Sequence, residues 1–125
     1  MAIINRIAEF QPEMAEWRRD IHKHPETAFE EERTADLVAA KLHAFGIEVH
    51  RGLAGTGVVG TLEGNEDGGG RAIGLRADMD ALHIREVNEF DHRSVDEGRH
   101  EGRMHACGHD GHTTMLLGAA KYLAE

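Results

Sequence analysis

A stripe of apolar residues at helical spacing near the N-terminus constrains the fold more than any other sequence feature. Successive members lie four, three, four, three and four positions apart, which places them on one face of a helix. They are Ile3, Ile7, Phe10, Met14, Trp17 and Ile21. Pro12 lies inside the stripe, so either one helix kinks there, or a first helix ends at Gln11 and a second begins with Pro12 in its first turn. His24–Pro25 should end the element, because the residue before proline avoids helical geometry.

A second helix and a third are predicted from the same periodicity. Thr27 and Glu30 have capping-box spacing at the start of the second helix, and Gly46 suits its C-terminal end. The apolar pattern of the third helix runs from about Asp110 to Leu123.

Three strands are expected between these helices, at residues 47–50, 57–62 and 71–77. Residues 64–70 are rich in glycine and suit a flexible hairpin connection, whereas residues 84–104 are polar with little periodicity. The order of elements predicts an α/β or α+β domain with helices on a small sheet.

Composition excludes several classes of protein. The 125 residues suffice for one domain, and 14 basic against 23 acidic residues give a net charge of −9, which disfavours nucleic-acid binding. No apolar run reaches the roughly 18 residues of a membrane span, and we see no signal peptide. The single cysteine, Cys107, excludes an internal disulfide and suits the cytoplasm.

Gly55, Gly57 and Gly60 match the spacing of a dinucleotide-binding fingerprint. That fingerprint requires a helix after the glycines, but the residues that follow Gly57 are typical of a strand. We therefore interpret this segment as a glycine-rich turn and strand.

Asp78 and Asp80 follow the third predicted strand and should leave it on the same side, since side chains alternate along a strand. They could face a ligand crevice, where two close carboxylates need a cation, or they could begin a solvated loop. His83 follows the pair and could face the same crevice. His22 and His24 are expected to be surface or capping residues at a helix end.

The segment His105–His112 carries three histidines, a cysteine and an aspartate just before a helix. Glycines at 108 and 111 permit a tight backbone, so Cys107 and His109 could turn toward one metal ion, with Asp110 orienting the neighbouring His109. The spacing is not that of a zinc finger. The alternative is a buried structural thiol near helix-capping residues.

Three segments in this order, at residues 17–26, 74–82 and 104–112, resemble the amidohydrolase branch of the M20 metallopeptidases, which includes hippurate hydrolases, indole-acetyl amino acid hydrolases and N-acetyl-diaminopimelate deacetylases. The resemblance extends from about Arg6 to Tyr122. It implies an α/β fold, with part of a mixed, mostly parallel sheet flanked by helices as in zinc exopeptidases. It also implies one or two divalent ions (Zn, Mn or Ni) and hydrolysis of N-acyl amino acid amides.

The resemblance also implies roles for individual residues. Cys107 and His109 match metal ligands, and Asp80 matches a catalytic-site acid that orients a ligand. Asp78 falls where related branches place a ligand histidine, and His83 stands where this branch usually has proline. Asp78, Asp110, His112 and His83 are thus candidates to support a ligand or to face the substrate.

Members of the family are much longer than this chain, so the resemblance implies that residues 1–125 are the N-terminal part of a catalytic domain. The general-base glutamate, further histidine ligands and a dimerisation or lid domain would lie downstream. The number of ligands also indicates that part of the site is missing, because a catalytic metal site needs about three protein ligands and an open position, and this chain clearly offers two. We expect residues 1–125 alone to be inactive and the full-length enzyme to be a homo-oligomer.

Two alternatives remain at this point. One is a small, non-enzymatic metal-binding module built on the His105–His112 segment. The other is a thiol hydrolase in which Cys107 is the nucleophile and a remote histidine is the base.

Overall fold

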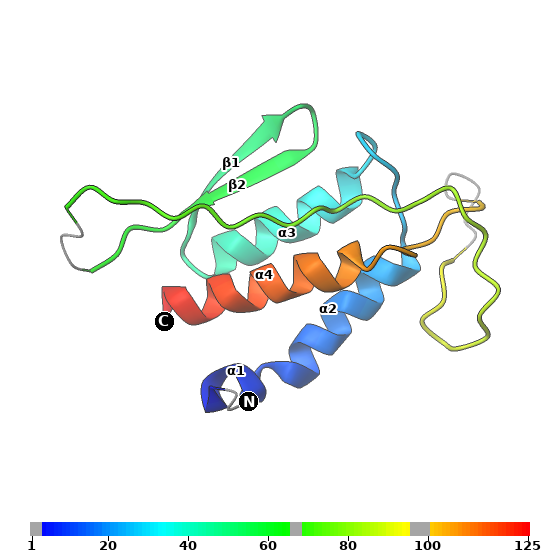
Figure 1. Ribbon diagram of the computed structural model, residues 1–125, viewed down its shortest axis with the longest axis horizontal. Coiled ribbons are helices and arrows are strands. Elements are labelled where there is room, and N and C mark those ends of the chain that lie inside the picture. Colours follow the sequence, from blue (N-terminus) through cyan, green and yellow to red (C-terminus); the bar gives the residue numbers. More distant parts are fainter. Residues whose placement is uncertain (1–3, 66–68, 96–100) are drawn as a thin grey trace.

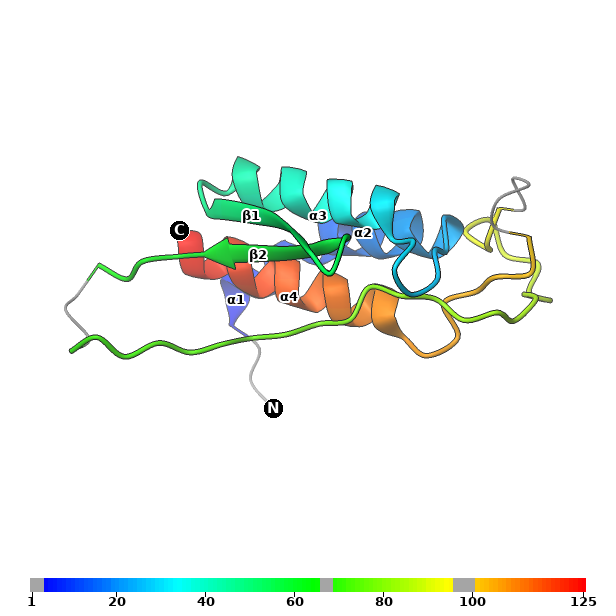
Figure 2. The same ribbon diagram turned by 90° about the horizontal axis from the view of Figure 1, so that it is seen from above.

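The computed structural model describes residues 4–65, 69–95 and 101–125. Along the chain the elements are α1 (Asn5–Glu9), α2 (Gln11–Lys23), α3 (Glu32–Ala44), β1 (Glu48–Leu53), β2 (Gly57–Thr61) and α4 (His109–Ala124). Helix α4 lies between α2 and α3, and the β1–β2 hairpin packs on α3 (Figure 1). The view from above shows the chain from about residue 70 to residue 80 as an extended segment that runs past the helices (Figure 2).

The apolar N-terminal stripe forms two helices, as in the second of the two expected arrangements, but the first helix ends before Gln11. Helix α1 ends at Glu9, and α2 begins at Gln11 with Pro12 in its first turn. Proline is tolerated there because its missing N–H has no partner in the first turn of a helix. Helix α2 ends at Lys23, immediately before His24–Pro25, as predicted. Ile3 lies outside the described residues.

The start of α3 differs from the prediction. Thr27 and Glu30 do interact, with the Thr27 hydroxyl donating to the Glu30 carboxylate at 2.9 Å, but the helix begins later and this pair does not cap it. The buried carboxylate of Glu26 does so instead, accepting the backbone N–H groups of Arg33 at 2.9 Å and Thr34 at 2.7 Å. The prediction was wrong because the capping group lies farther back, in the connection from α2.

The core lies where the three long helices and the hairpin meet. Its central buried residues are Trp17, Leu42, Ile47 and Leu117. Helices α2 and α4 approach closely at Gly118, where an added Cβ would lie 2.6 Å from the sulfur of Met14. This packing fixes α4, and therefore the residues at its N-terminus, against α2.

The described residues form one two-stranded sheet, in which the expected mixed, mostly parallel character is not seen. Strands β1 and β2 pair antiparallel, with Glu48 opposite Thr61 and His50 opposite Val59. The turn between them contains Ala54 and Gly55 at positive φ, and a strand follows it, so the glycine pattern forms a turn and strand as interpreted.

The predicted strand at residues 71–77 is extended but not paired in the described part of the chain. Ile73 and Leu75 are 89% and 59% exposed. Where the structure describes the chain, residues 81 and 82 just beyond it form isolated bridges, Ala81 with Thr27 and Leu82 with Met104. A strand needs a hydrogen-bonded neighbour, so the apolar pattern alone could not make one.

The remaining connections contain no helix or strand among their described residues. This holds for 84–95 and 101–104 of the polar segment, while residues 96–100 lie outside the described part. The predicted hairpin connection at 64–70 includes residues 66–68, which also lie outside it. Of the helices described, none is long and apolar enough to cross a membrane.

Candidate metal centre

Two segments distant in sequence meet at the N-terminus of α4. The backbone N–H groups of Leu82 and Met104 each donate to the other residue's carbonyl at 3.0 Å, which joins the chain after the acidic pair to the chain before Cys107. The Thr113 hydroxyl on α4 donates to the carbonyl of Asp78 at 2.9 Å. These contacts hold the acidic pair against the first turns of α4.

His109, the first residue of α4, is oriented by Asp80. Its Nδ1 lies 2.9 Å from the backbone oxygen of Asp80 and 2.9 Å from the Oδ1 atom of the same residue. Both oxygens are acceptors, so Nδ1 must carry the hydrogen. The Nε2 lone pair is therefore left for another partner, as in histidines that bind a metal ion.

Asp78 lies on the other side of the same ring. Its Oδ2 atom is 4.0 Å from Nε2 of His109, and its Oδ1 atom is 2.6 Å from a guanidinium nitrogen of Arg76. The two carboxylates thus reach one imidazole, which agrees with the prediction that they leave the chain on the same side. A negative charge beside a free imidazole nitrogen is an arrangement that suits a divalent cation.

Cys107 is exposed, which excludes the alternative of a buried structural thiol. Gly108 follows it with φ +87°, a left-handed conformation that glycine adopts without strain, and forms the N-cap of α4. This turn separates the thiol from His109 by one residue. No group of three histidine, cysteine or acidic side chains among the described residues is close enough to hold a metal ion.

The donor set therefore fits part of a metal site. The free Nε2 of His109 and the exposed thiol of Cys107 are soft to borderline ligands, and Asp78 adds a nearby carboxylate. A complete catalytic shell needs about three protein ligands, so further donors are required.

Asp110 does not orient His109, contrary to expectation. Its side chain is buried, and Oδ2 accepts from Nδ1 of His22 at 2.9 Å and from Nε of Arg18 at 3.3 Å. The direction of helix α4 explains this, because neighbouring residues of a helix project about 100° apart. The residue that orients His109 is Asp80, and not Asp110 as the sequence suggested.

His22 is likewise not a surface residue. Its side chain is 9% exposed, and its Nε2 atom lies 3.0 Å from Oε1 of Glu86. The hydrogen bond to Asp110 raises the pKa of His22 more than burial lowers it, and Glu86 raises it further. His24, the other histidine expected at this helix end, does bond locally, to the backbone oxygen of Asp20 at 2.9 Å.

The two carboxylates around His22 have lowered pKa values. Burial alone would raise the pKa of Glu86, but hydrogen bonds from Asn88, Ser94 and His22 outweigh it and bring the pKa to about 2. Burial likewise opposes ionisation of Asp110, whose hydrogen bond with His22 contributes most to lowering its pKa to about 2.

His105 is buried without partners. Neither ring nitrogen has a hydrogen-bond partner, and among the described residues the other buried side-chain polar atom in this condition is Oδ1 of Asp110. Burial lowers the pKa of His105 to about 4, so the ring is neutral at pH 7.

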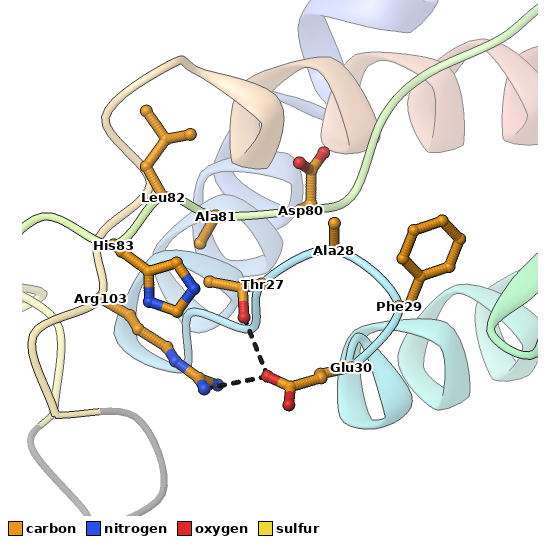
Figure 3. A pocket seen from close by; sticks show the side chains of 9 residues that line it. All are labelled: Thr27, Ala28, Phe29, Glu30, Asp80, Ala81, Leu82, His83 and Arg103. Carbon is orange, nitrogen blue, oxygen red and sulfur yellow. Dashed lines mark hydrogen bonds and ion pairs between the residues drawn. The ribbon is translucent and has the colours of Figure 1, made fainter.

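The last two candidates are His112 and His83. His112 is exposed on α4, with its ring centroid 5.7 Å from that of His109. His83 and Asp80 both line a pocket of about 570 Å³, in which Arg103 pairs with Glu30 at 2.9 Å. Their side chains point in opposite directions, with His83 toward Arg103 (Figure 3).

Sequence reasoning missed Glu86 and Arg18 as parts of the site. Glu86 lies in a polar segment without periodicity. Arg18 lies on α2, a helix that was predicted from its apolar face and not from its charged residues. Arg18 lies within the family-like segment 17–26, but that segment gave it no role, and no local signal distinguished Glu86 from an ordinary surface charge.

The start of α4 thus combines a carboxylate-oriented histidine with a second nearby carboxylate, and an exposed thiol lies two positions before that histidine in the sequence. Residues 74–125 match the family described as Peptidase family M20/M25/M40.

Several known proteins are similar to this chain over most of its length. Hippurate hydrolase from Campylobacter jejuni is 51% identical over 125 residues, covering 99% of this chain and 31% of the hydrolase. N-acyl-L-amino acid amidohydrolase from Geobacillus stearothermophilus is 45% identical over 95% of this chain and 30% of its own. The YXEP protein of Bacillus subtilis, described as a dinuclear metal binding peptidase from the M20 family, superimposes with a TM-score of 0.83 at 38% identity, over 94% of this chain and 31% of that one. The chain thus spans about three tenths of the length of these relatives.

Proposed function

We propose that the protein carrying this chain is a metal-dependent amidohydrolase that cleaves the amide bond of N-acyl amino acids. In this proposal, residues 1–125 are the N-terminal part of its catalytic domain. The observation that carries the proposal is the double contact from Asp80 to Nδ1 of His109, which leaves Nε2 available to a metal ion. The names of the two similar hydrolases support the substrate class.

Each residue of the centre has a role in this proposal. His109 and Cys107 would hold a divalent ion (Zn, Mn or Ni), one of one or two in the complete site, and Asp80 keeps the His109 ring in the required orientation. Asp78 would offset the positive charge of an ion bound at Nε2 of His109. When bound, the ion supplies Lewis acidity to the scissile carbonyl and lowers the pKa of a bound water.

The remaining parts of the site would come from outside residues 1–125. The described residues group no three metal-binding side chains, whereas hydrolysis needs about three ligands and a base within hydrogen-bond reach of the water. We assign a general-base glutamate, further ligands and a dimerisation or lid domain to those parts. The complete enzyme would then be a cytoplasmic homo-oligomer that acts on small molecules, not on nucleic acids or membranes.

The test is a hydrolysis assay on the longest natural form of the protein, loaded with metal and supplied with hippurate. We expect Cys107→Ala and His109→Ala to lose both bound metal and turnover. His50→Ala, which changes an exposed histidine on β1, is the matched control and should keep both. Full activity of Cys107→Ala with undiminished metal content would refute the proposal.

Two further measurements separate the alternatives. Inactivation by iodoacetamide that metal does not slow would favour Cys107 as a nucleophile over Cys107 as a ligand. Residues 1–125 alone should show no turnover and only weak metal binding. A stable, monodisperse 1–125 chain that binds one metal ion tightly would favour the non-enzymatic module.

A further inference from the structure

We propose that Glu86, His22 and Asp110 form a buried clamp that positions the first turn of α4, and with it the metal ligand His109. The inference rests on the proposed function, because it assigns positioning residues to that metal site. The Glu86–His22–Asp110 clamp touches neither His109 nor Cys107 through any side-chain hydrogen bond given by the structure, so it would act through the backbone of α4.

The chemistry of the clamp is specific to a charged histidine. Nδ1 of His22 lies 2.9 Å from Asp110 and Nε2 lies 3.0 Å from Glu86, and the three side chains are at most 9% exposed. Because each nitrogen faces a carboxylate oxygen, both must carry hydrogen. A glutamine at this position could donate from only one nitrogen, so it could not replace both contacts.

The clamp joins three parts of the fold that are far apart in sequence. His22 lies in the last turn of α2, Asp110 lies in the first turn of α4, and Glu86 lies in the long polar connection. The polar connection is itself anchored there, because the backbone N–H of Ser94 donates to Glu86 at 2.6 Å and that of Val95 donates to the carbonyl of Lys23 at 2.8 Å.

The first turn of α4 is thus held from two directions. Asp80 holds the ring of His109, and His22 holds the carboxylate of Asp110, the next residue. Gly108, in a left-handed conformation, precedes the turn and offers little resistance to its rotation. Because Gly108 does not restrain the orientation of the first turn of α4, the clamp provides a restraint on it.

Stability alone is a weak explanation for the clamp. Burying charges costs desolvation energy that their attraction often only balances, and a well-packed apolar replacement is frequently as stable. A precise geometric requirement explains the arrangement better, because a metal ligand displaced by a small distance loses affinity.

The test is a Co²⁺ titration of the longest natural form of the protein, following the thiolate-to-cobalt charge-transfer band. We expect His22→Gln and Glu86→Gln each to weaken Co²⁺ binding by about tenfold and to alter the visible spectrum, as changes to groups that orient ligands do. With hippurate, kcat should fall more than KM rises. Glu86→Gln provides a milder second variant should His22→Gln fold poorly.

Glu13→Gln is the matched control. It breaks the ion pair with Lys121, which also links α2 to α4 but lies away from the metal centre, so it should lower Tm without changing the Co²⁺ affinity or spectrum. Wild-type affinity and spectrum in both clamp variants would overturn the clamp and leave the proposed function standing. A wild-type protein that shows no thiolate band with Co²⁺ would overturn both.

Discussion

Asp80 binds His109 twice, with its backbone oxygen and its Oδ1 atom both 2.9 Å from the same ring nitrogen. The backbone contact sets where the ring lies, and the carboxylate adds negative charge that makes Nε2 a stronger donor to a cation. One residue thus fixes both the orientation and the electronic character of the proposed ligand.

Asp80→Asn should therefore reduce metal affinity while leaving the fold intact. Asparagine keeps the backbone contact and the side-chain volume but removes the charge, so we expect a loss of roughly 10- to 100-fold in metal affinity. Metal content after dialysis against a graded series of chelator concentrations measures it. Asp36→Asn, which changes an exposed carboxylate paired with Arg51, is the control. Equal metal retention in the two variants would contradict the assigned role of Asp80.

Glu26→Ala should destabilise the protein by roughly 3 kcal/mol. The buried carboxylate accepts hydrogen bonds from the backbone N–H groups of Arg33 and Thr34 and from the Thr34 hydroxyl, and removing it leaves these donors unpaired at the start of α3. Urea unfolding measures the change. Glu30→Ala removes a carboxylate that is 58% exposed and should cost much less. Similar losses for the two variants would show that Glu26 does not cap α3.

The parts of the fold that follow from local spacing were predictable from the sequence. The three long helices, the break near Pro12 and the two strands of the hairpin depend on residues a few positions apart. Asp78 and Asp80 project to the same side because side chains alternate along an extended chain, which is also a local property of the sequence.

Features that depend on distant partners were not predictable. The expected strand at 71–77 has no paired neighbour in the described chain, although its apolar pattern is typical of a strand. His22 contacts Glu86 and Asp110, which lie 64 and 88 positions away in the sequence. The residues next to His22 in the sequence therefore do not indicate that its side chain is buried between two carboxylates. Asp110 was assigned to His109 because it is adjacent in sequence, and the helix turns the two side chains apart.

Gly118→Ala should change the free energy of unfolding by less than about 0.5 kcal/mol, because displacing Met14 offsets the better helix propensity of alanine. The new Cβ would lie 2.6 Å from the sulfur and terminal carbon of Met14, which are the far end of a flexible side chain, so moving them costs no more than about the propensity gain of about 1 kcal/mol. In a Met14→Ala background the clash is absent, so the same substitution should stabilise. Urea unfolding of the four variants in this cycle measures both effects, and an equal effect in the two backgrounds would rule out the Met14 contact as the cause.

The free energy of unfolding should decrease as the pH falls from 6.5 toward 4, because of His105. Burial lowers the pKa of this unpartnered histidine to about 4 in the folded chain, against 6.5 when unfolded. In this window the unfolded chain gains the proton and the folded chain does not, so protonation favours unfolding by at most on the order of 3 kcal/mol. Folding raises the pKa of His22, so the stabilisation that its charged form provides is fully present below pH 6.5. Folding lowers the pKa of Glu86, so the stabilisation that its carboxylate provides is lost only below about pH 4.5.

The measurement is urea unfolding in the presence of a chelator at several pH values, for the wild type and for His105→Gln. Glutamine does not titrate, so the difference between the two curves isolates His105 from the other histidines, which contribute equally to both. We expect the wild type to lose stability relative to His105→Gln between pH 6.5 and 4.5. Parallel curves over this range would show that His105 is not held neutral in the folded protein.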